Sequence, residues 1–313
     1  VVIQNPPRNS IENLDELPFP ARDLFPMERY IPLPNQYKKL PLTNMVVIRG
    51  CPYFCTFCDQ AGTGARRRSP KKVVDEIKHC VEKFGVKEIS FWDDTMSYHK
   101  KWMNEFLNLL IEANLDIIWS CYAAVNTVDK NILQLMHKAG CWNIFFGFET
   151  GVEELSKNIL THRKNRNFKQ MKKVAKWTRE AGIESRGSFM IGIPGETPEL
   201  AKQTVQNAIE LDPDYAQFSI VCPYPGTQLQ KEIKKGKWGK FIEEDFEKYH
   251  VWDVTWLPEG YKSVEELKNM ERYAYRKFYL RLSYIMKRIL KIRSFEDIKR
   301  YIKGGTALMK AFL

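Results

Sequence analysis

The sequence predicts an α/β protein in which six β–α units follow one another, with a helical extension after them. From residue 44 to 221, short apolar runs alternate with segments that carry apolar residues at helical spacing. Proline-containing start signals and glycine stop signals bound several of these segments. Alternating strands and helices form a parallel sheet covered by helices. Six units suit either an open doubly wound sheet or a partial barrel, and both folds bind ligands at the carboxyl ends of their strands.

The expected strands are the apolar runs, and each helix follows from its caps and its periodicity. Ser69 and Thr197 are N-cap residues followed by proline at the first helical position, and Gly85, Gly140 and Gly182 end three helices. Strands are expected at 45–49, 87–92, 116–120, 142–148, 184–193 and 214–221. Helices are expected at 70–84, 101–114, 127–139, 165–181 and 197–211.

Three segments are expected along the chain: a proline-rich linker or wrap at 1–43, a core at 44–260 and a basic helical extension at 261–313. The net charge is +11, and the extension holds fourteen Lys or Arg against five Asp or Glu. An apolar stripe in the extension predicts that this helix packs onto the core. The alternative is that the stripe contacts a membrane surface or a hydrophobic substrate. The stripe consists of Phe278, Leu282, Ile285, Ile289 and Ile292.

The composition limits the class of protein. It is 44% hydrophobic and 28% charged, which is ordinary for a globular protein. No apolar stretch reaches the roughly 18 residues of a membrane span, and no signal peptide is visible. The isolated Cys80, Cys121, Cys141 and Cys222 indicate buried thiols in a reducing, cytoplasmic setting. Because the first residue is Val1, the chain is expected to begin inside a longer gene product.

Three cysteines, Cys51, Cys55 and Cys58, follow the first expected strand. A structural zinc site usually has four ligands, and no second Cys pair or His pair has ligand spacing in this sequence. A redox Cys-x-x-Cys accounts for Cys55 and Cys58 but leaves Cys51 unexplained. A 4Fe–4S cluster held by three thiolates explains the number better, because its fourth iron is then open to another ligand.

The spacing Cys-x3-Cys-x-aromatic-Cys, formed by Cys51, Cys55, Phe57 and Cys58, resembles the signature of the radical S-adenosylmethionine (SAM) superfamily. The resemblance implies a partial (β/α)6 barrel, a 4Fe–4S cluster on the three cysteines, and Phe57 beside the cofactors. It also implies that SAM binds the open iron and is cleaved reductively. The 5′-deoxyadenosyl radical formed in this way abstracts hydrogen from a substrate. The catalytic residues beyond the cluster remain unknown.

Polar residues at the other expected strand ends are candidate SAM contacts. The family places a polar group after the second strand, and Asp93 or Asp94 would meet the methionine amine there. N-capping of the next helix is the alternative for each aspartate. Glu149 in FGFETG would face the ribose or the methionine, and Gly192 in IGIPGET would let the backbone approach the adenine. Glu196 either contacts the cofactor or fixes that turn.

Arg186 is a further candidate, either for the SAM carboxylate or as a surface cation. Some relatives carry an arginine after the third strand, where this chain has Ala124, so one SAM or substrate contact of the family has no counterpart there. The stretch AGTGARRR at 61–68 departs from the pattern G-x-G-x-x-G, so a dinucleotide site is rejected.

The order of several motifs resembles the cobalamin-dependent branch of the superfamily. These motifs are RGCPYFCTFC, RRRSPKKVVDEI, FWDDT, FGFETG, IGIPGET and PYPGT. The branch includes the anaerobic magnesium-protoporphyrin cyclase, hopanoid-modifying enzymes and C-methyltransferases. The resemblance implies methylation, cyclisation or rearrangement at an unactivated carbon of a hydrophobic substrate. The cobalamin motif Asp-x-His-x-x-Gly is absent from this sequence, so cobalamin would come from a domain outside these 313 residues.

The expected partners follow from the same resemblance. They are a one-electron reductant of the flavodoxin or ferredoxin type and a small-molecule substrate such as a lipid or a tetrapyrrole. No nucleic acid is expected, and peripheral membrane association is an additional hypothesis. A tRNA-modifying methylthiotransferase is the alternative enzyme, although its second cluster and its C-terminal β-domain are not seen. A non-catalytic iron–sulfur scaffold is the alternative outside enzymes.

Overall fold

The computed structural model describes residues 3, 5–6, 8–160, 167–250, 253–292 and 295–312. Its centre is a six-stranded parallel sheet whose strands follow the order of the sequence. The strands are β1 (Leu42–Met45), β4 (Glu88–Phe91), β5 (Ile118–Ala123), β6 (Cys141–Glu149), β7 (Glu184–Ile191) and β8 (Tyr215–Ile220). Each connection leads to the neighbouring strand, so the order never reverses as a doubly wound sheet requires. Because β1 and β8 remain edges, the sheet is a partial barrel and does not close.

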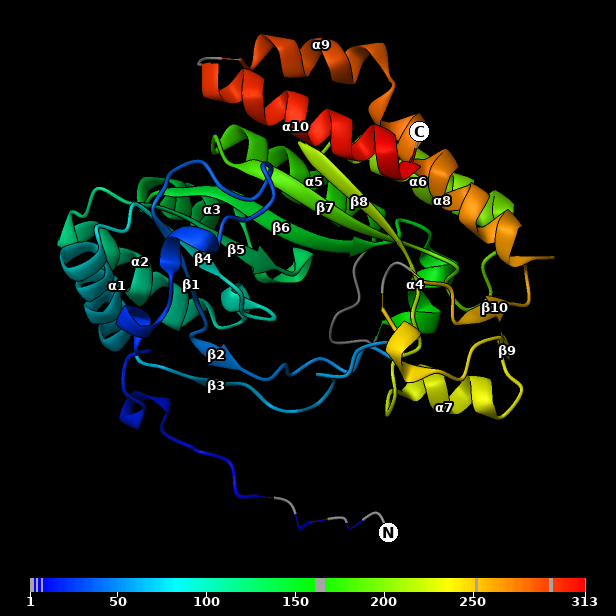
Figure 1. Ribbon diagram of the computed structural model, residues 1–313, viewed down its shortest axis with the longest axis horizontal. Helices are drawn as coiled ribbons and strands as arrows, with labels where there is room; N and C mark the ends of the chain where they lie inside the picture. Colours follow the sequence, from blue (N-terminus) through cyan, green and yellow to red (C-terminus); the bar gives the residue numbers. More distant parts are fainter. Residues whose placement is uncertain are drawn as a thin grey trace.

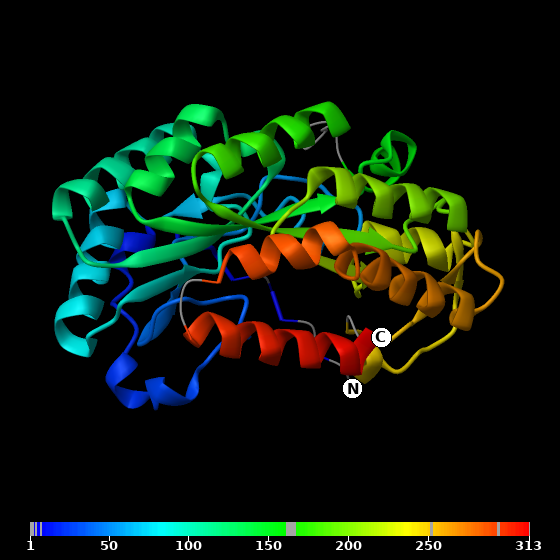
Figure 2. The ribbon, with the colours of Figure 1, turned by 90° about the horizontal axis from the view of Figure 1, so that it is seen from above.

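Helices cover one face of this sheet (Figures 1 and 2). The covering helices are α1 (Pro70–Phe84), α2 (Lys100–Ala113), α3 (Lys130–Lys138), α5 (Phe168–Glu180) and α6 (Pro198–Leu211). The caps predicted from the sequence are confirmed, since Ser69 accepts the Lys72 N–H and Thr197 accepts the Leu200 N–H. The expected helix 165–181 begins at Phe168 here, and its first two residues lie outside the described part of the chain.

The opposite face of the sheet is left open. Helix-facing rings are fully buried, and Phe148, Phe189 and Phe218 stack with centroids 5.5 and 5.4 Å apart. On the other face, several of the alternating side chains stay partly exposed, as Phe145 and Ser188 do. A strand buried on one face and accessible on the other presents its second face to ligands. The face of the sheet opposite the helices is therefore accessible next to the carboxyl ends of its strands.

The first strand differs from the expectation of 45–49, because β1 ends at Met45. Asp93 Oδ1 accepts the Val47 N–H at 2.7 Å and the Ile48 N–H at 2.5 Å. This carboxylate takes the amides that would otherwise extend the strand. The chain then leaves the sheet, and β2 (Ile48–Arg49) pairs antiparallel with β3 (Arg66–Arg67). The cysteines therefore lie in the loop of a hairpin outside the main sheet.

The N-terminal segment wraps along α1 through the short turns η1 (Leu14–Glu16), η2 (Arg22–Leu24) and η3 (Met27–Arg29). Arg22 pairs with the fully buried Glu76 of α1 at 2.6 Å, and Arg68 forms a second ion pair with the same carboxylate. Farther along, the Lys38 and Lys39 N–H groups donate to Glu88 at 2.8 and 2.7 Å. These contacts close the amino end of the sheet with residues that precede β1.

Helix α8 (Val264–Tyr279) covers the edge strand β8. The Tyr279 hydroxyl accepts the Ala216 N–H at 3.0 Å and donates to the Ala216 carbonyl at 2.7 Å. The Tyr275 hydroxyl accepts the Phe218 N–H at 3.2 Å. The tyrosine hydroxyls thereby form hydrogen bonds with backbone N–H and C=O groups of β8, which in an exposed edge strand could pair with another chain.

The apolar stripe of the extension packs on the core at Phe278, which is fully buried there, but not at Leu282, Ile285 and Ile289, which are exposed. Helix α9 (Leu282–Leu290) instead turns its cations inward, where Lys287 and Arg281 pair with Asp212 and Arg288 pairs with Asp214. Leu282 and Ile289 are consequently 75% and 54% exposed. The buried Asp214 favours this orientation most, because an unpaired buried carboxylate costs more than exposed leucines, and the partly exposed Asp212 adds two further ion pairs.

Helix α10 (Phe295–Phe312) lies beside α9 in both views (Figures 1 and 2). The remaining elements are α4 (Glu153–Ile159), α7 (Gln228–Lys234), η4 (Met96–Tyr98), η5 (Val125–Thr127), η7 (Phe246–Lys248), and the hairpin β9 (Gly239–Phe241) and β10 (Trp256–Pro258). Within the described ranges, no helix has the length and apolar character needed to cross a bilayer.

Candidate functional site

The cysteine loop starts with a turn that requires glycine. Gly50 has a φ of 84°, and a Cβ there would lie 1.9 Å from the Gly64 carbonyl oxygen. The Cys51 N–H donates to Thr63 Oγ1 at 3.1 Å, and the Gly62 N–H donates to the Tyr53 carbonyl at 2.8 Å. The hairpin backbone therefore shapes the loop before any ligand binds.

Thr56 holds this loop between two short helices at the carboxyl end of the sheet. Its N–H donates to the Ile159 carbonyl at the end of α4, at 3.0 Å. Its carbonyl accepts the Leu229 N–H at the start of α7, at 2.8 Å. Sequence reasoning missed Thr56, because neither partner lies near it in the chain and its residue type carries no signal.

The three cysteines lie in or beside an apolar cluster. Cys51 and Cys55 are buried within it and Cys58, at its rim, is partly buried. Burial, together with the nearby Cys55, Asp59 and Cys51, raises the pKa of the Cys58 thiol to about 11. The thiols are thus close enough to influence one another. Their deprotonation calls for a positive partner such as a metal centre.

Asp93 and Asp94 end up in different environments. Asp93 is buried and binds the backbone of residues 47–48, as described above, and burial raises the pKa of its carboxyl group to about 7. Its second oxygen, Oδ2, is buried and has no hydrogen-bond partner among the residues that the structure describes. Asp94 is exposed at the end of β4. Asp93 therefore positions the start of the cysteine loop, and Asp94 is the more accessible of the two.

Glu149 ends β6 in a conformation that few side chains adopt. Its φ is 58°, and the register of β6 on β7 shifts between Gly147 and Glu149. A Cβ on Gly147 would lie 2.6 Å from Glu149 Oε1, so the glycine leaves room for this carboxylate. A left-handed glutamate at a strand end is uncommon, and such backbone strain concentrates at functional sites.

Glu196 closes the turn after β7. Its Oε1 accepts the Gly192 N–H at 2.5 Å and the Tyr261 O–H at 2.6 Å. Its Oε2 is buried, and no described residue forms a hydrogen bond with it. Gly192 has a φ of 76°, and a Cβ there would face Leu267 and Pro258. Both residues thus stabilise the turn and its contact with α8. Of the two roles expected for Glu196, fixing the turn is the one that its hydrogen bonds support.

The Glu196→Gln variant should lack the part of the pH dependence of the unfolding free energy that comes from this carboxyl group. Burial raises the pKa of Glu196 to about 7, whereas the unfolded chain titrates near the ordinary value of about 4.3. The stability that this group contributes is therefore full below about pH 4 and is lost as the pH rises through about 7. In urea titrations, wild type should lose unfolding free energy relative to Glu196→Gln between about pH 4 and 7. Parallel pH profiles for the two proteins would contradict this assignment.

A family model described as the radical SAM superfamily matches residues 45–208. This chain belongs to the radical SAM superfamily. The matched span contains the cysteine loop, Asp93, Glu149 and Glu196, which follow or end strands β1, β4, β6 and β7 of one sheet.

Relatives of this radical SAM protein extend the match. It is 34% identical over 310 residues to an uncharacterized methyltransferase of Pyrococcus horikoshii, across 97% of this chain and 64% of the relative. It is 29% identical over 317 residues to the anaerobic magnesium-protoporphyrin IX monomethyl ester cyclase of Rubrivivax gelatinosus, across 100% of this chain and 54% of the relative. The chain thus spans between half and two thirds of the length of these relatives.

Its fold is also that of a solved radical SAM enzyme. The cobalamin-dependent SAM radical enzyme OxsB, with aqua-cobalamin bound, superposes with a TM-score of 0.62. The superposition covers 86% of this chain and 46% of OxsB, at 14% identity, and so it shows a shared fold alone.

Radical SAM proteins use a 4Fe–4S cluster and SAM, and the cysteine loop fits such a cluster. Among the residues that the structure describes, no three His, Cys, Asp or Glu side chains could hold one metal ion. Thiolates on one zinc ion lie about 3.8 Å apart, whereas those on a cube of four irons lie farther apart. Three buried or half-buried thiols on a clamped loop therefore suit the cluster better than zinc.

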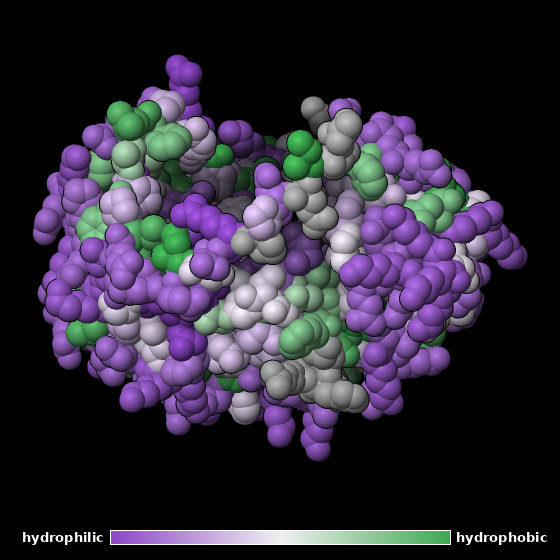
Figure 3. All heavy atoms as spheres, turned by 90° about the horizontal axis from the view of Figure 1, so that it is seen from below, coloured by the Kyte–Doolittle hydropathy of each residue, from purple (hydrophilic) through white to green (hydrophobic). Residues whose placement is uncertain are grey.

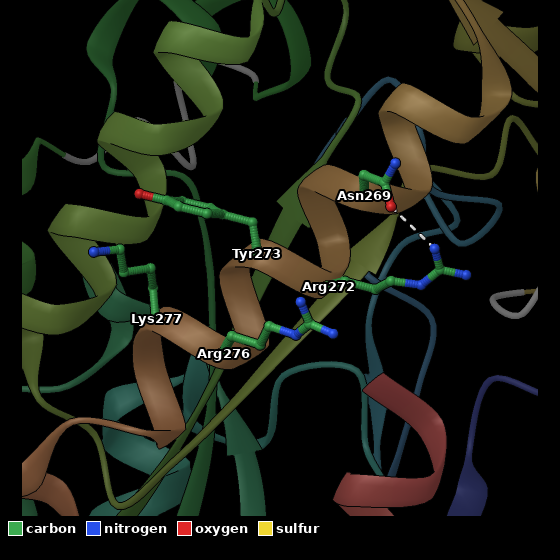
Figure 4. A pocket seen from close by; sticks show the side chains of 5 residues that line it. All are labelled: Asn269, Arg272, Tyr273, Arg276 and Lys277. Atoms are coloured by element: carbon green, nitrogen blue, oxygen red, sulfur yellow. Dashed lines mark hydrogen bonds between the residues drawn. The ribbon is translucent and has the colours of Figure 1, made fainter. Parts of the chain in front are cut away.

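An open pocket on the solvent side of α8 lies apart from this radical SAM site (Figure 4). Its lining residues are Asn269, Arg272, Tyr273, Arg276 and Lys277, all from α8. None of them belongs to the cysteine loop or to a strand end. We therefore place the candidate active site at the cysteine loop.

Proposed function

We propose that this chain is the radical SAM part of an enzyme that methylates, cyclises or rearranges a hydrophobic small molecule at an unactivated carbon. The observation that carries the proposal is the cysteine loop, clamped by Thr56 at the carboxyl end of a parallel sheet whose second face is open. The resemblance to a methyltransferase and a cyclase supports the choice of reaction classes.

The roles of the residues follow from their positions. Cys51, Cys55 and Cys58 would hold the 4Fe–4S cluster, which, when bound, supplies the electron for reductive cleavage of SAM. Asp94 and Glu149, at the ends of β4 and β6, would contact the amine or the ribose of SAM. The apolar cluster around the loop keeps water away from the reacting atoms.

Cobalamin would be an additional cofactor of the full protein. The fold shared with a cobalamin-dependent enzyme supports this proposal, as does the order of motifs in the sequence. None of the five histidines lies in an Asp-x-His-x-x-Gly motif, so these 313 residues do not supply that ligand. We therefore assign cobalamin binding to another part of the protein.

Anaerobic reconstitution tests the core of the proposal. With SAM and dithionite, or with a reduced flavodoxin or ferredoxin, the reconstituted chain should release 5′-deoxyadenosine, measured by liquid chromatography and mass spectrometry. The reason is that SAM cleavage needs only the cluster site and the strand ends present here. A chain that holds iron but releases none with any donor would be a scaffold and would overturn the proposal.

The exposed face of α9 and α10 supports peripheral association with a membrane surface. Leu282, Leu290 and Ile302 are 75%, 69% and 62% exposed, and Lys299 and Lys303 lie exposed on α10. Apolar and basic side chains on one amphipathic surface favour an anionic lipid interface. The chain should therefore cosediment with vesicles of anionic phospholipid, and Leu282→Glu/Leu290→Glu should reduce the bound fraction. Equal sedimentation of the variant and wild type would contradict this role.

A further inference from the structure

A row of four side chains crosses the open face of the sheet. Tyr122 of β5 pairs in register with Phe145 of β6, Phe145 with Arg186 of β7, and Arg186 with Tyr215 of β8. In a parallel sheet, residues in register project from the same face. The Tyr122 and Phe145 rings lie 5.1 Å apart, and the Arg186 guanidinium lies 5.0 Å from the centre of the Phe145 ring. Arg186 thus stands within an aromatic row, and a second cation, Arg288, lies 4.6 Å from the centre of the Tyr215 ring at the end of the row.

The Arg186 cation is buried without an ion-pair partner among the described residues. Arg186 is only 6% exposed, and its Nε donates to Asn143 Oδ1 at 2.7 Å. Burial lowers the pKa of Arg186, because nearby groups do not fully offset the loss of water. A buried charge of this kind costs several kcal/mol unless an anion meets it.

The neighbouring carboxylates have other partners. Glu88 accepts the Lys38 and Lys39 N–H groups and, at 2.9 Å, the Trp142 indole N–H. Glu184 pairs with the Lys38 ammonium at 2.9 Å. Neither carboxylate therefore forms an ion pair with Arg186, although Glu88 contributes to its electrostatic surroundings. The described residues offer the terminal nitrogens of Arg186 no ion-pair partner, so a group from outside the chain can meet them.

Arg186 also lies far from the cysteine loop along its strand. It is the third residue of β7, and the strand ends at Ile191. Five residues of strand correspond to about 16 Å. SAM on the cluster would occupy the carboxyl-end rim, whereas Arg186 lies toward the floor of the open face. The space-filling view from below shows a hollow near the middle of the face that it presents (Figure 3).

We propose that Arg186 binds an anionic group of the substrate, a carboxylate or a phosphate, while a flat unsaturated portion of the substrate lies along Trp92, Tyr122 and Phe145. Trp92 continues the row, with its ring 5.7 Å from Tyr122 and 48% exposed. A guanidinium fork held at Nε presents its terminal N–H groups to an oxyanion, and aromatic faces favour a flat apolar ligand. The inference deepens the proposed function and rests on it.

Three pyrene probes test this subsite on the full reconstituted chain. They are pyrenebutyrate, its methyl ester and pyrenyl phosphate, each titrated by fluorescence anisotropy. Pyrenebutyrate should bind wild type at least about tenfold more tightly than its ester, because only the acid meets the guanidinium. The tighter of the carboxylate and the phosphate probe identifies the anion.

Variants separate recognition from structure. Arg186→Gln should weaken pyrenebutyrate to the level of the ester and leave the ester unchanged, while Arg186→Lys should be intermediate. Arg272→Gln, which removes a cation from the α8 pocket, should bind all three probes as wild type does. Equal binding of acid and ester to wild type would overturn the proposal, as would an equal loss of both in Arg186→Gln.

The test also distinguishes a cofactor role. If Arg186→Gln raised the Kd of SAM while probe binding stayed unchanged, Arg186 would serve the SAM carboxylate and this inference would be wrong. The probes report binding without turnover. A wild type that failed to cleave SAM would therefore refute the proposed function and still leave the probe titrations readable.

Discussion

In the Cys55→Ala variant we expect iron to fall from about four atoms per chain to background after anaerobic reconstitution. Release of 5′-deoxyadenosine should vanish with it. Cys55 is buried at 4% exposure in the middle of the clamped loop, and two remaining thiols cannot hold a cube against solvent. Iron and sulfide assays, together with the broad visible absorbance of the cluster, measure the loss.

Cys80→Ala is the matched control for this prediction. Cys80 is also buried, but it lies in α1 and packs in the main core. Its removal should cost about 1 kcal/mol of stability and leave the iron content unchanged. Normal iron binding by a Cys51→Ala/Cys55→Ala/Cys58→Ala variant would be incompatible with a cluster on this loop.

The second large effect is expected for stability. Glu76→Ala should lower the free energy of unfolding by about 3–5 kcal/mol, because it leaves two buried arginines without their carboxylate. Glu76 is fully buried, and Arg22 and Arg68 are 5% and 8% exposed. Arg22 belongs to the N-terminal wrap and Arg68 follows β3, so this carboxylate joins both segments to α1. Urea denaturation followed by circular dichroism measures the change.

Glu82→Ala provides the comparison on the same helix. Glu82 is exposed on α1, and its loss should change the unfolding free energy by less than about 0.5 kcal/mol. If Glu76→Ala were as stable as Glu82→Ala, the wrap would not depend on the buried ion pairs.

Much of the fold could be predicted because its signals are local. The helices begin where Ser69 and Thr197 cap them, and they end within one or two residues of the expected positions. The parallel sheet followed from the alternation of strands and helices, since a crossover through a helix joins parallel strands. The sequence left open whether the sheet was doubly wound or a partial barrel, and the unreversed strand order decided that question.

The site was predictable to a different degree at each residue. The cysteine triad could be recognised because its spacing lies within one loop. The contacts of Asp93 could not, because they are backbone amides of residues 47–48, brought next to it by the pairing of β1 with β4. The same contacts shifted the first strand from the expected 45–49 to 42–45. Glu149 was a candidate from its motif, but its left-handed backbone appears only in the structure.

By itself, the sequence determined the series of β–α units, the cysteine loop and the family to which they belong, because all three depend on spacing along the chain. Only the tertiary structure decided which face of α9 is buried and which partners Arg186 has. Asp212 and Asp214 draw the cations of α9 inward, and Asn143 and Phe145 hold Arg186 on the open face. The physical reason is that the cost of burying a charge depends on partners that are distant in sequence and meet only in the fold.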